Sequence, residues 1–460
     1  MHSRTLCILA AVALLSAPLI GQQTDFDNRD SPPDESMTAA RSTAPADRIL
    51  EAQMDSQLRV LIAETLERNP AIAGALALAS AAEQRASSVG ALPDPVVGLT
   101  AFLKSPETRT GPQILSLNFL QSLPWLSKFD LEEQANLLSA TALYADAEAK
   151  RLELTTEIRR LYYDLAFLSR YKEITRDFVD HLRQHEEISQ SRYATGVGAS
   201  QDVIKIQAEI TLAESLLIDI DQRRIDLEAS INALRDRPAS TLIRTALLPS
   251  GQQVALDFGQ LRESAARSRP ELAAADARIA ATEVRVKRAE KAFRPDFKVG
   301  LTYTFVDPRQ DQAGILLPPE GNGDDILGIQ GGVSVPIWRK RTKAGVAAAS
   351  ELELSAREAK RDVLAGIESE LGDLMQRIPL TWQQLRLLQD ILILQAEESV
   401  QSAQSGYISG TFNALDLLDA EHVLFDAETS IARAQADYAI RLTQLERVVA
   451  QPLQQISTTE

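Results

Sequence analysis

Apolar residues recur three and four positions apart in turn over long stretches of the chain, which is the spacing of a coiled-coil helix face. Two such runs are Leu154, Ile158, Leu161, Leu165 and Leu168, and Ile206, Ile210, Ala213, Leu217 and Ile220. No proline occurs between Trp125 and Pro238, so we predict long helices over about 127–190 and 200–236. The first would be roughly 95 Å long at 1.5 Å per residue, longer than the helices of ordinary globular domains.

The second half of the chain predicts the same pair of helices, over 340–405 and 413–450, with a kink at Pro379. In each half a shorter Ala-rich helix comes first, over 57–90 and 258–292. A proline shortly after each short helix ends it, because proline disfavours helical backbone in the residue before it.

Alternation of apolar with polar or small residues follows each short helix and predicts β-strands. The apolar positions are Leu115, Leu117 and Phe119 in the first half, and Phe297, Val299, Leu301, Tyr303, Phe305, Leu327, Ile329, Gly331, Val333 and Val335 in the second. Residues 96–103 are strand-like with weaker alternation. Strands of about 9–11 residues can cross a bilayer when tilted, with apolar side chains toward lipid. A soluble hairpin packed on helices would show the same alternation.

Trp125 and Trp338 each follow the second strand of a pair, beside Lys128, Arg339 and Lys340. Tryptophan and long cations suit a membrane–water interface, so we expect both tryptophans to be interface anchors. Four strands cannot close a barrel, for which about eight are needed, and an open sheet edge is not tolerated in lipid. The strand count therefore predicts a homo-oligomer whose subunits share one barrel.

The same landmarks occur twice in the same order, which indicates a duplication of a whole architectural unit. The matched pairs are Asn69-Pro70 with Arg269-Pro270, Pro93-Asp94 with Pro295-Asp296, Ser122-Leu123-Pro124 with Ser334-Val335-Pro336, Tyr193 and Gly196 with Tyr407 and Gly410, and Asp202-Val203 with Asp416-Leu417. We predict a signal peptide over 1–21, a flexible leader over 22–56, a first repeat over 57–237, a connector over 238–257, a second repeat over 258–452 and a tail over 453–460.

The predicted signal peptide has a positive start at Arg4 and a short apolar core over 6–15. It also holds Cys7, the only cysteine of the chain. The mature protein would then have neither a disulfide nor a cysteine metal site. No lipoprotein cysteine stands at the expected cleavage site. No later stretch approaches the ~20 apolar residues of a transmembrane helix.

The net charge of -16 disfavours nucleic acid as a partner. His181 and His185 are spaced for one helix face, but no third ligand accompanies them, so we expect solvated histidines and no metal site. The sequence holds no phosphate-binding loop and no convincing catalytic triad. We therefore expect no catalytic residue, no cofactor and no enzyme activity.

Two segments, 192–202 (RYATGVGASQD) and 406–416 (GYISGTFNALD), resemble the periplasmic helix-tip turns of the TolC-like outer-membrane factor family. The duplication, the strand pairs and the export signal agree with this resemblance, which covers about 57–452. Segments 92–95 (LPDP) and 121–125 (QSLPW) look most like the heavy-metal efflux branch. That branch usually has Gly-Lys-Arg after the tryptophan, and this chain has LSKF instead.

The resemblance implies a mainly α fold with transmembrane β-strands. In a homotrimer, the long duplicated helices would form a periplasmic α-barrel, and four strands per subunit would complete one outer-membrane β-barrel. The protein would sit in the outer membrane of a Gram-negative-type bacterium, against its lipid. It would conduct substrate passively from a periplasmic adaptor (membrane fusion) protein and an inner-membrane RND or ABC-type pump, in efflux or type I secretion. The alternative is a soluble periplasmic coiled-coil structural or adaptor protein.

Candidate site residues come from the two tip segments. Asp416 and Asp419 lie one helical turn apart and match the paired aspartates of the family's tunnel constriction, and Tyr407 matches a position that helps to hold the tip closed. Two solvated acids at a helix start would look the same, because the helix dipole favours them there. The resemblance also implies adaptor contacts at the tips, at positions Tyr193, Gly196, Asp202 and Gly410. The two glycines are better explained as left-handed turn positions, and Phe412 stands where the family can carry a basic residue.

Overall fold

The computed structural model describes residues 55–244 and 247–453. The predicted signal peptide, nearly all of the predicted leader and all but the first residue of the predicted tail lie outside these residues. The first repeat contains α4 (Ser56–Arg68), α5 (Pro70–Val89), α6 (Ser127–Ala194) and α7 (Ser200–Leu234). The second contains α8 (Phe258–Ser268), α9 (Pro270–Glu290), α11 (Arg339–Leu387), a π-helical turn (Leu388–Leu392), α12 (Ile393–Ser409) and α13 (Ala414–Val449).

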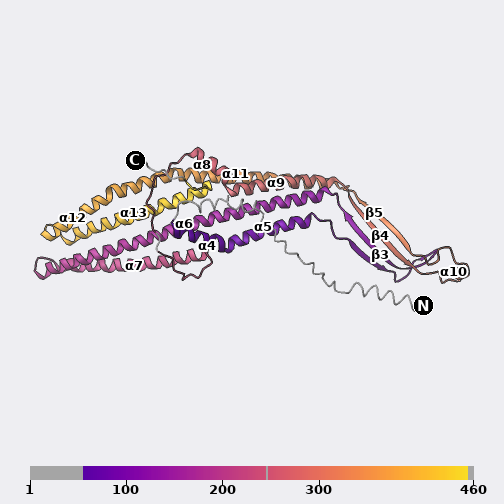
Figure 1. Ribbon diagram of the computed structural model, residues 1–460, viewed down its shortest axis with the longest axis horizontal. Helices are drawn as coiled ribbons and strands as arrows, with labels where there is room; N and C mark the ends of the chain where they lie inside the picture. Colours follow the sequence, from indigo (N-terminus) through magenta and orange to yellow (C-terminus); the bar gives the residue numbers. More distant parts are fainter. Residues whose placement is uncertain (1–54, 245–246, 454–460) are drawn as a thin grey trace. The chain divides into compact units, whose positions relative to one another are not determined.

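The matching order of elements in the two halves confirms the duplication at the level of secondary structure (Figure 1). The four long predicted helices are present, and α6 has 68 residues, or roughly 100 Å of helix. Its predicted coiled-coil positions Leu154, Ile158 and Leu165 are buried. Ile158 and Leu165 pack in one cluster with residues of α4 and α7, so the apolar spacing does line a core.

The prediction of a single short helix at the start of each half was wrong. The chain breaks at Asn69 and at Arg269, which have extended backbones. Each break precedes a proline, which forces the preceding residue out of the helical region and then starts the next helix, where its missing N–H is no loss. Asn69 also caps α5, because its side chain accepts a hydrogen bond from the backbone N–H of Ala71 at 2.9 Å.

The strands form one antiparallel sheet in the order β1 (Val96–Ala101), β3 (Gly111–Leu123), β4 (Asp296–Val306) and β5 (Ile326–Ser334). The two repeats meet in the middle of this sheet, where β3 pairs with β4 from Leu115↔Phe305 to Leu123↔Phe297. Within the described residues, β1 and β5 each have only one neighbouring strand, so both edges of the sheet are open. Two short elements without a predicted counterpart lie in the strand connections: β2 (Glu107–Thr108) and α10 (Gln312–Leu316).

The two faces of the sheet differ as the alternation predicts. Apolar residues such as Leu99, Leu301 and Ile329 are exposed. On the other face, the hydroxyls of Ser116 and Thr304 lie 3.2 Å apart across β3 and β4 and are buried. A soluble hairpin packed on helices would bury the apolar face instead, so the exposed apolar face argues against that reading.

In the described part of the chain, no helix is long and apolar enough to cross a membrane.

Candidate functional site: the helix tips

The first tip joins α6 to α7 and depends on a left-handed glycine. Gly196 has φ of 77°. The backbone N–H groups of Val197 and Gly198 both donate to the carbonyl oxygen of Arg192, at 3.0 Å each. This arrangement satisfies carbonyls at the end of α6 and turns the chain back toward α7.

The second tip repeats this geometry between α12 and α13. Gly410 is left-handed, with φ of 81°, and the N–H groups of Thr411 and Phe412 donate to the Gly406 carbonyl at 2.9 and 3.0 Å. A side chain on Gly406 would collide with the Phe412 ring, so this glycine also makes room for it. The expectation that Gly196 and Gly410 are left-handed turn positions is confirmed.

The two tips contact each other through Arg192 and Tyr407. The Arg192 guanidinium lies 4.8 Å from the centroid of the Tyr407 ring. It also donates to the carbonyl oxygens of Tyr407 and Ile408, at 2.5 and 3.2 Å. Tyr407 is only 1% exposed. One cation of the first tip therefore binds the end of α12 by cation–π attraction and by neutralising helix-end carbonyls.

The sequence analysis did not single out Arg192, although it had one usable indication. A cation in the last turn of a helix is favoured by the helix dipole, and Arg192 occupies that place in α6. The sequence could not show that the guanidinium leaves its own helix end and binds the other tip. A basic residue, Arg192, therefore contacts Tyr407, although Phe412 stands where the family can carry a basic residue.

Asp416 and Asp419 are both exposed and lie on one side of α13. They line a shallow groove between α12 and α13, together with Ser399, Ser402, Ala403, Phe412, Ala420 and Val423. Tyr407 is not with them, because it faces the first tip. The structure thus brings the two aspartates together and separates them from the tyrosine.

Asp416 has a structural task as well. Its carboxylate accepts a hydrogen bond from the backbone N–H of Asn413 at 3.0 Å. The Asn413 side chain in turn accepts from the N–H groups of Leu415 and Asp416, at 2.8 and 3.1 Å. This reciprocal capping box fixes the start of α13. Asp419 has no such bond among the described residues and is the freer of the two acids.

The other candidate tip residues lie on the surface. Tyr193 is 55% exposed, and Asp202 is half-buried in the first turn of α7, where the helix dipole favours an acid. An exposed tyrosine beside a left-handed turn is available to a partner protein.

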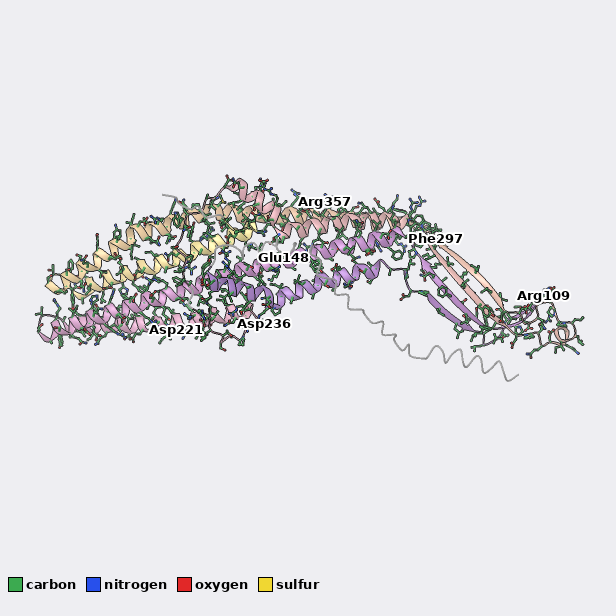
Figure 2. The ribbon with its side chains drawn as sticks, viewed as in Figure 1. Arg109, Glu148, Asp221, Asp236, Phe297 and Arg357 are labelled. Carbon is green, nitrogen blue, oxygen red and sulfur yellow. The ribbon has the colours of Figure 1, made fainter. Side chains whose placement is uncertain are left out.

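The tryptophans lie at the junction of helices and strands, which Phe297 marks in Figure 2. Trp125 contacts the Phe297 ring at a centroid distance of 6.5 Å, and its backbone N–H donates to Asp296 at 2.9 Å. Lys128 donates to the same carboxylate oxygen at 2.7 Å. Trp338 is 72% exposed.

A buried carboxylate that the sequence analysis missed lies near the tips. Glu421 on α13 is 2% exposed and contacts two imidazoles of α6: His185 at 2.7 Å and His181 at 3.3 Å. Burial raises the pKa of Glu421, but the hydrogen bonds and charges of His185 and His181 outweigh it and hold the pKa below its usual value. The prediction of solvated histidines is wrong for His185, which is buried.

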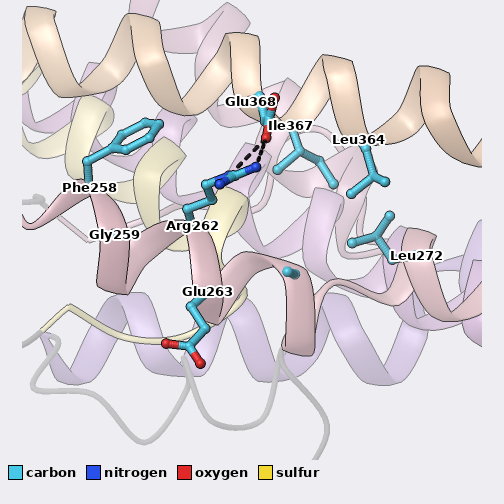
Figure 3. Close-up of a pocket in the computed structure, with 9 residues that line it drawn as sticks. Phe258, Gly259, Arg262, Glu263, Leu272, Leu364, Ile367 and Glu368 are labelled. Carbon is cyan, nitrogen blue, oxygen red and sulfur yellow. Dashed lines mark hydrogen bonds and ion pairs between the residues drawn. The ribbon is translucent and has the colours of Figure 1, made fainter.

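Across 55–244 and 247–453, no three His, Cys, Asp or Glu side chains are arranged to hold a metal ion. Away from the tips, a hollow lies between α8, the start of α9 and α11 (Figure 3). Its walls combine apolar and charged side chains, and Arg262 reaches across it to Glu368 at 2.6 Å. The hollow is therefore a crevice left where these helices pack against each other.

Long duplicated helical hairpins, a sheet with an exposed apolar face and two glycine-turned tips define the class of outer-membrane efflux ducts. The chain belongs to the outer membrane efflux protein family: the family model of that description matches residues 61–235 and 261–451.

Individual relatives agree. Outer membrane protein TolC of Vibrio cholerae is 23% identical over 406 residues, which cover 83% of this chain and 88% of that protein. Nodulation protein T of Rhizobium leguminosarum bv. viciae is 22% identical over 459 residues, covering 94% of this chain and 90% of that protein. The solved outer-membrane channel OprN has the same fold, with a TM-score of 0.73 at 19% identity over 86% of this chain and 90% of that chain.

The predicted family, fold class and location are therefore confirmed. The chain is an outer-membrane efflux protein with a large periplasmic portion, and the soluble coiled-coil alternative is not favoured. Its family is one of transport ducts, which are not enzymes.

Proposed function

We propose that three copies of this chain assemble into one continuous duct, which receives substrate from a periplasmic adaptor and an inner-membrane pump and releases it outside the cell. The observation that carries this proposal is a pair of exposed apolar rows on helices that otherwise bury their apolar face.

The first of these, the α7 row, consists of Ile204, Ile218 and Ile225, which are 61–65% exposed. The second, the α12 row, runs from α11 into α12 and consists of Leu380, Leu387, Leu394 and Ile408, which are 54–62% exposed. Members of each row are seven or fourteen residues apart, which keeps one helical face within α7, within α11 and within α12. The π-helical turn at Leu388–Leu392 separates the α11 members of the α12 row from its α12 members.

Both rows have the spacing of a coiled-coil seam and neither has a partner within the described residues. An α7 row that packs on the α12 row of the next copy would bury both and would close a ring of helices. Their placement on different repeats suits a head-to-tail contact, which closes into a ring when the rotation allows.

The sheet supports the same assembly. Its two edge strands, β1 and β5, have free backbone groups on one side, and its apolar face is exposed. Joining β5 of one copy to β1 of the next would pair those groups, and three copies would bring four strands each to one barrel in the outer membrane. Trp125 and Trp338 would then lie at the periplasmic edge of the lipid.

At the opposite ends of the long helices, we place the gate and the adaptor contact. Tyr193, Gly196, Asp202 and Gly410 would present the tip turns to the adaptor. In a trimer, Asp416 and Asp419 would contribute six carboxylates to one constriction. Such a ring would attract cations and resist closure by mutual repulsion. The Arg192–Tyr407 contact would oppose that repulsion by holding the second tip against the first.

Mass and dimensions of the detergent-extracted protein test the assembly. We expect a trimer that requires detergent, measured by light scattering and negative-stain imaging, with helices that project roughly 100 Å from the detergent belt. A monomer that stays soluble without detergent would overturn the shared barrel and the duct.

The gate is tested by planar-bilayer conductance of the trimer. In the Asp416→Asn/Asp419→Asn variant, the amide oxygen at 416 can still accept the capping hydrogen bond, so the variant removes charge but keeps the helix start. We expect a clear loss of cation preference. The matched control is Asp426→Asn, an exposed acid farther along α13. Equal selectivity in the gate variant and the parent would refute the gate assignment.

A further inference from the structure

The histidines beyond the predicted signal peptide gather at one level of the helical hairpins. His181 and His185 lie one turn apart on α6, and His422 lies on α13 next to Glu421. This level is five to six residues of α13 beyond Asp416 and two to three residues beyond Asp419. Imidazoles are the side chains whose charge changes near neutral pH, so their position between the two hairpins and beside the gate invites an explanation.

Glu421 is the centre of this group. Its side chain is 3% exposed, and each of its two oxygens contacts one imidazole of the other hairpin. Oε1 lies 2.7 Å from Nε2 of His185, and Oε2 lies 3.3 Å from Nδ1 of His181. A buried carboxylate is costly unless its hydrogen bonds and its charge are satisfied. Glu421 therefore holds α13 to α6 only while these two histidines supply its hydrogen bonds and balance its charge.

The two histidines have different access to protons. His185 is buried, and its second ring nitrogen, Nδ1, has no hydrogen-bond partner among the described residues. A proton added there would be a buried donor without an acceptor, which costs free energy. The side chain of His181 is 46% exposed, so it can exchange protons with water while it faces Glu421. His185 is thus the fixed donor to the carboxylate, and His181 is the group that can change charge.

Other charged groups around the cluster come from every element packed on it. Glu428 of α13 lies near His181, and its pKa is raised, chiefly by burial and further by Asp177 of α6 and Glu397 of α12, while Arg170 of α6 and His181 oppose this rise. His422 faces Glu209 of α7 at 3.3 Å and contacts the Phe178 ring, tilted by 54°, at a centroid distance of 5.3 Å. The charged groups around the cluster are therefore mainly acidic.

We propose that His181 is a proton-binding site that sets how tightly the two hairpins are held together: its imidazolium pairs with the buried Glu421 carboxylate and locks α13 against α6. The inference rests on the proposed function, in which contacts that hold the second tip against the first oppose opening of the gate. A neutral imidazole contributes an ordinary hydrogen bond. The imidazolium makes a charge-assisted one, which is about twice as strong.

The direction of the pH effect follows from the two partners. The lock strengthens as falling pH converts a neutral imidazole to an imidazolium. It weakens again when Glu421 is protonated, which occurs below the usual range of a glutamate because the pKa of Glu421 is lowered. The lock is therefore strongest in mildly acidic solution, and the tip opens more readily at neutral and alkaline pH.

Hydrogen exchange of the detergent-solubilised trimer tests the lock without requiring conduction. Exchange of the first turns of α13, residues 414–425, is compared at about pH 7.5 and 5.5, which bracket the imidazole range, after correction for intrinsic rates. We expect protection to rise about fivefold at the lower pH, as a doubled hydrogen bond implies. The His181→Gln variant should lose this rise, and His422→Gln should keep it.

Two results would overturn the proposal: equal corrected protection of the parent protein at both pH values, or an undiminished rise in His181→Gln. His185→Leu provides a second check, since it should lower protection at both pH values by removing the fixed donor. Bilayer conductance separates the two levels of the argument. A trimer that conducts but shows no pH-dependent protection leaves the duct standing and removes the lock. A pH-dependent α13 in a protein that does not conduct removes the duct.

Discussion

The long arms of the two repeats differ, although duplication gave them the same origin. The first arm is one uninterrupted helix, α6, without a proline. The second arm contains Pro379 inside α11 and changes to a π-helical turn at Leu388–Leu392 before it continues as α12. The predicted kink at Pro379 is thus accompanied by a second irregularity that the sequence pattern did not indicate. The first arm is therefore one continuous helix, whereas the second arm contains a position at which the helix direction can change.

The landmark spacing accounts for part of this difference. The offset between repeats is 212 at Ser122 and Ser334 and 214 at Tyr193 and Tyr407, so the second arm is two residues longer. A π turn accommodates an inserted residue within a helix without breaking it. Such turns often mark functional positions, and this one lies between the middle of the molecule and the second tip.

The largest loss of stability is expected at a buried ion pair in the middle of the molecule. Arg159 on α6 pairs there with Glu446 on α13, and both residues are less than a tenth exposed. We expect Glu446→Ala to lower the free energy of unfolding by about 3–5 kcal/mol, because it leaves Arg159 buried without a counter-charge. Chemical denaturation of the trimer measures this. The double variant Arg159→Met/Glu446→Met should recover most of the loss, and a single variant as stable as the parent would contradict the assignment.

The exposed rows of the second arm are the next target. Leu387→Glu and Leu394→Glu place carboxylates in the proposed contact between copies, so we expect the trimer to dissociate or fail to form. Size-exclusion chromatography with light scattering measures this. Gln395→Glu adds the same charge at an exposed neighbouring position of α12 and should leave the trimer intact. A stable Leu387→Glu trimer would show that the α12 row faces solvent or another partner.

At the tips, the arms depend on Arg192. We expect Arg192→Ala to increase the open fraction of the duct about tenfold, since it removes a cation–π contact and two hydrogen bonds to carbonyls worth about 1–2 kcal/mol together. Arg192→Lys should recover only part of this, because an ammonium cannot bond both carbonyls and stack in the same pose. Single-channel recordings measure the open fraction, with Arg183→Ala as a surface control. Unchanged recordings in Arg192→Ala would exclude the contact from gating.

A smaller effect is expected from the linkage of Glu421 to pH. Its folded-state pKa is lowered, so its contribution to stability is present above its ordinary value of 4.5 and is lost as pH falls through the folded-state pKa. Glu421→Gln should therefore flatten the acid limb of a plot of melting temperature against pH. The parent protein should keep that limb, and identical acid limbs in the two proteins would contradict the linkage.

The smallest change is expected at Pro379. Pro379→Ala restores a backbone donor inside α11 but also gives the unfolded chain more freedom, and these effects of about 1 kcal/mol oppose each other. Melting temperature should change by no more than a few degrees, while hydrogen exchange around residues 375–379 should slow. A large loss of stability would mean that the second arm requires the proline for its course.

Much of the fold could be predicted because its determinants are local and periodic. Coiled-coil spacing gave the four long helices, and alternation gave the strands and their two unlike faces. The breaks at Asn69 and Arg269 were missed although each stands before a proline, because the Ala-rich pattern continues across both. The π turn was missed because nothing in its apolar spacing marks a change of hydrogen-bond register.

The candidate site was predicted less completely. The left-handed glycines and the two aspartates could be predicted, since each belongs to a turn or a helix start. The Arg192–Tyr407 contact could not, because its partners are 215 residues apart. The same holds for the contacts of Glu421 with His181 and His185, which are 240 and 236 residues away. In these pairs the chemistry depends on which residue of one helix lies opposite which residue of another.

By itself, the sequence determined the helices, the strands and the duplication, because spacing along a chain sets where each element lies and which of its sides is apolar. Only the tertiary structure decided that Arg192 serves the other tip and that a buried carboxylate joins two histidines across the hairpins. The physical reason is that packing between elements fixes helix register and side-chain direction. Two helices shifted past each other by one turn would have the same sequence pattern, but different residues would be in contact.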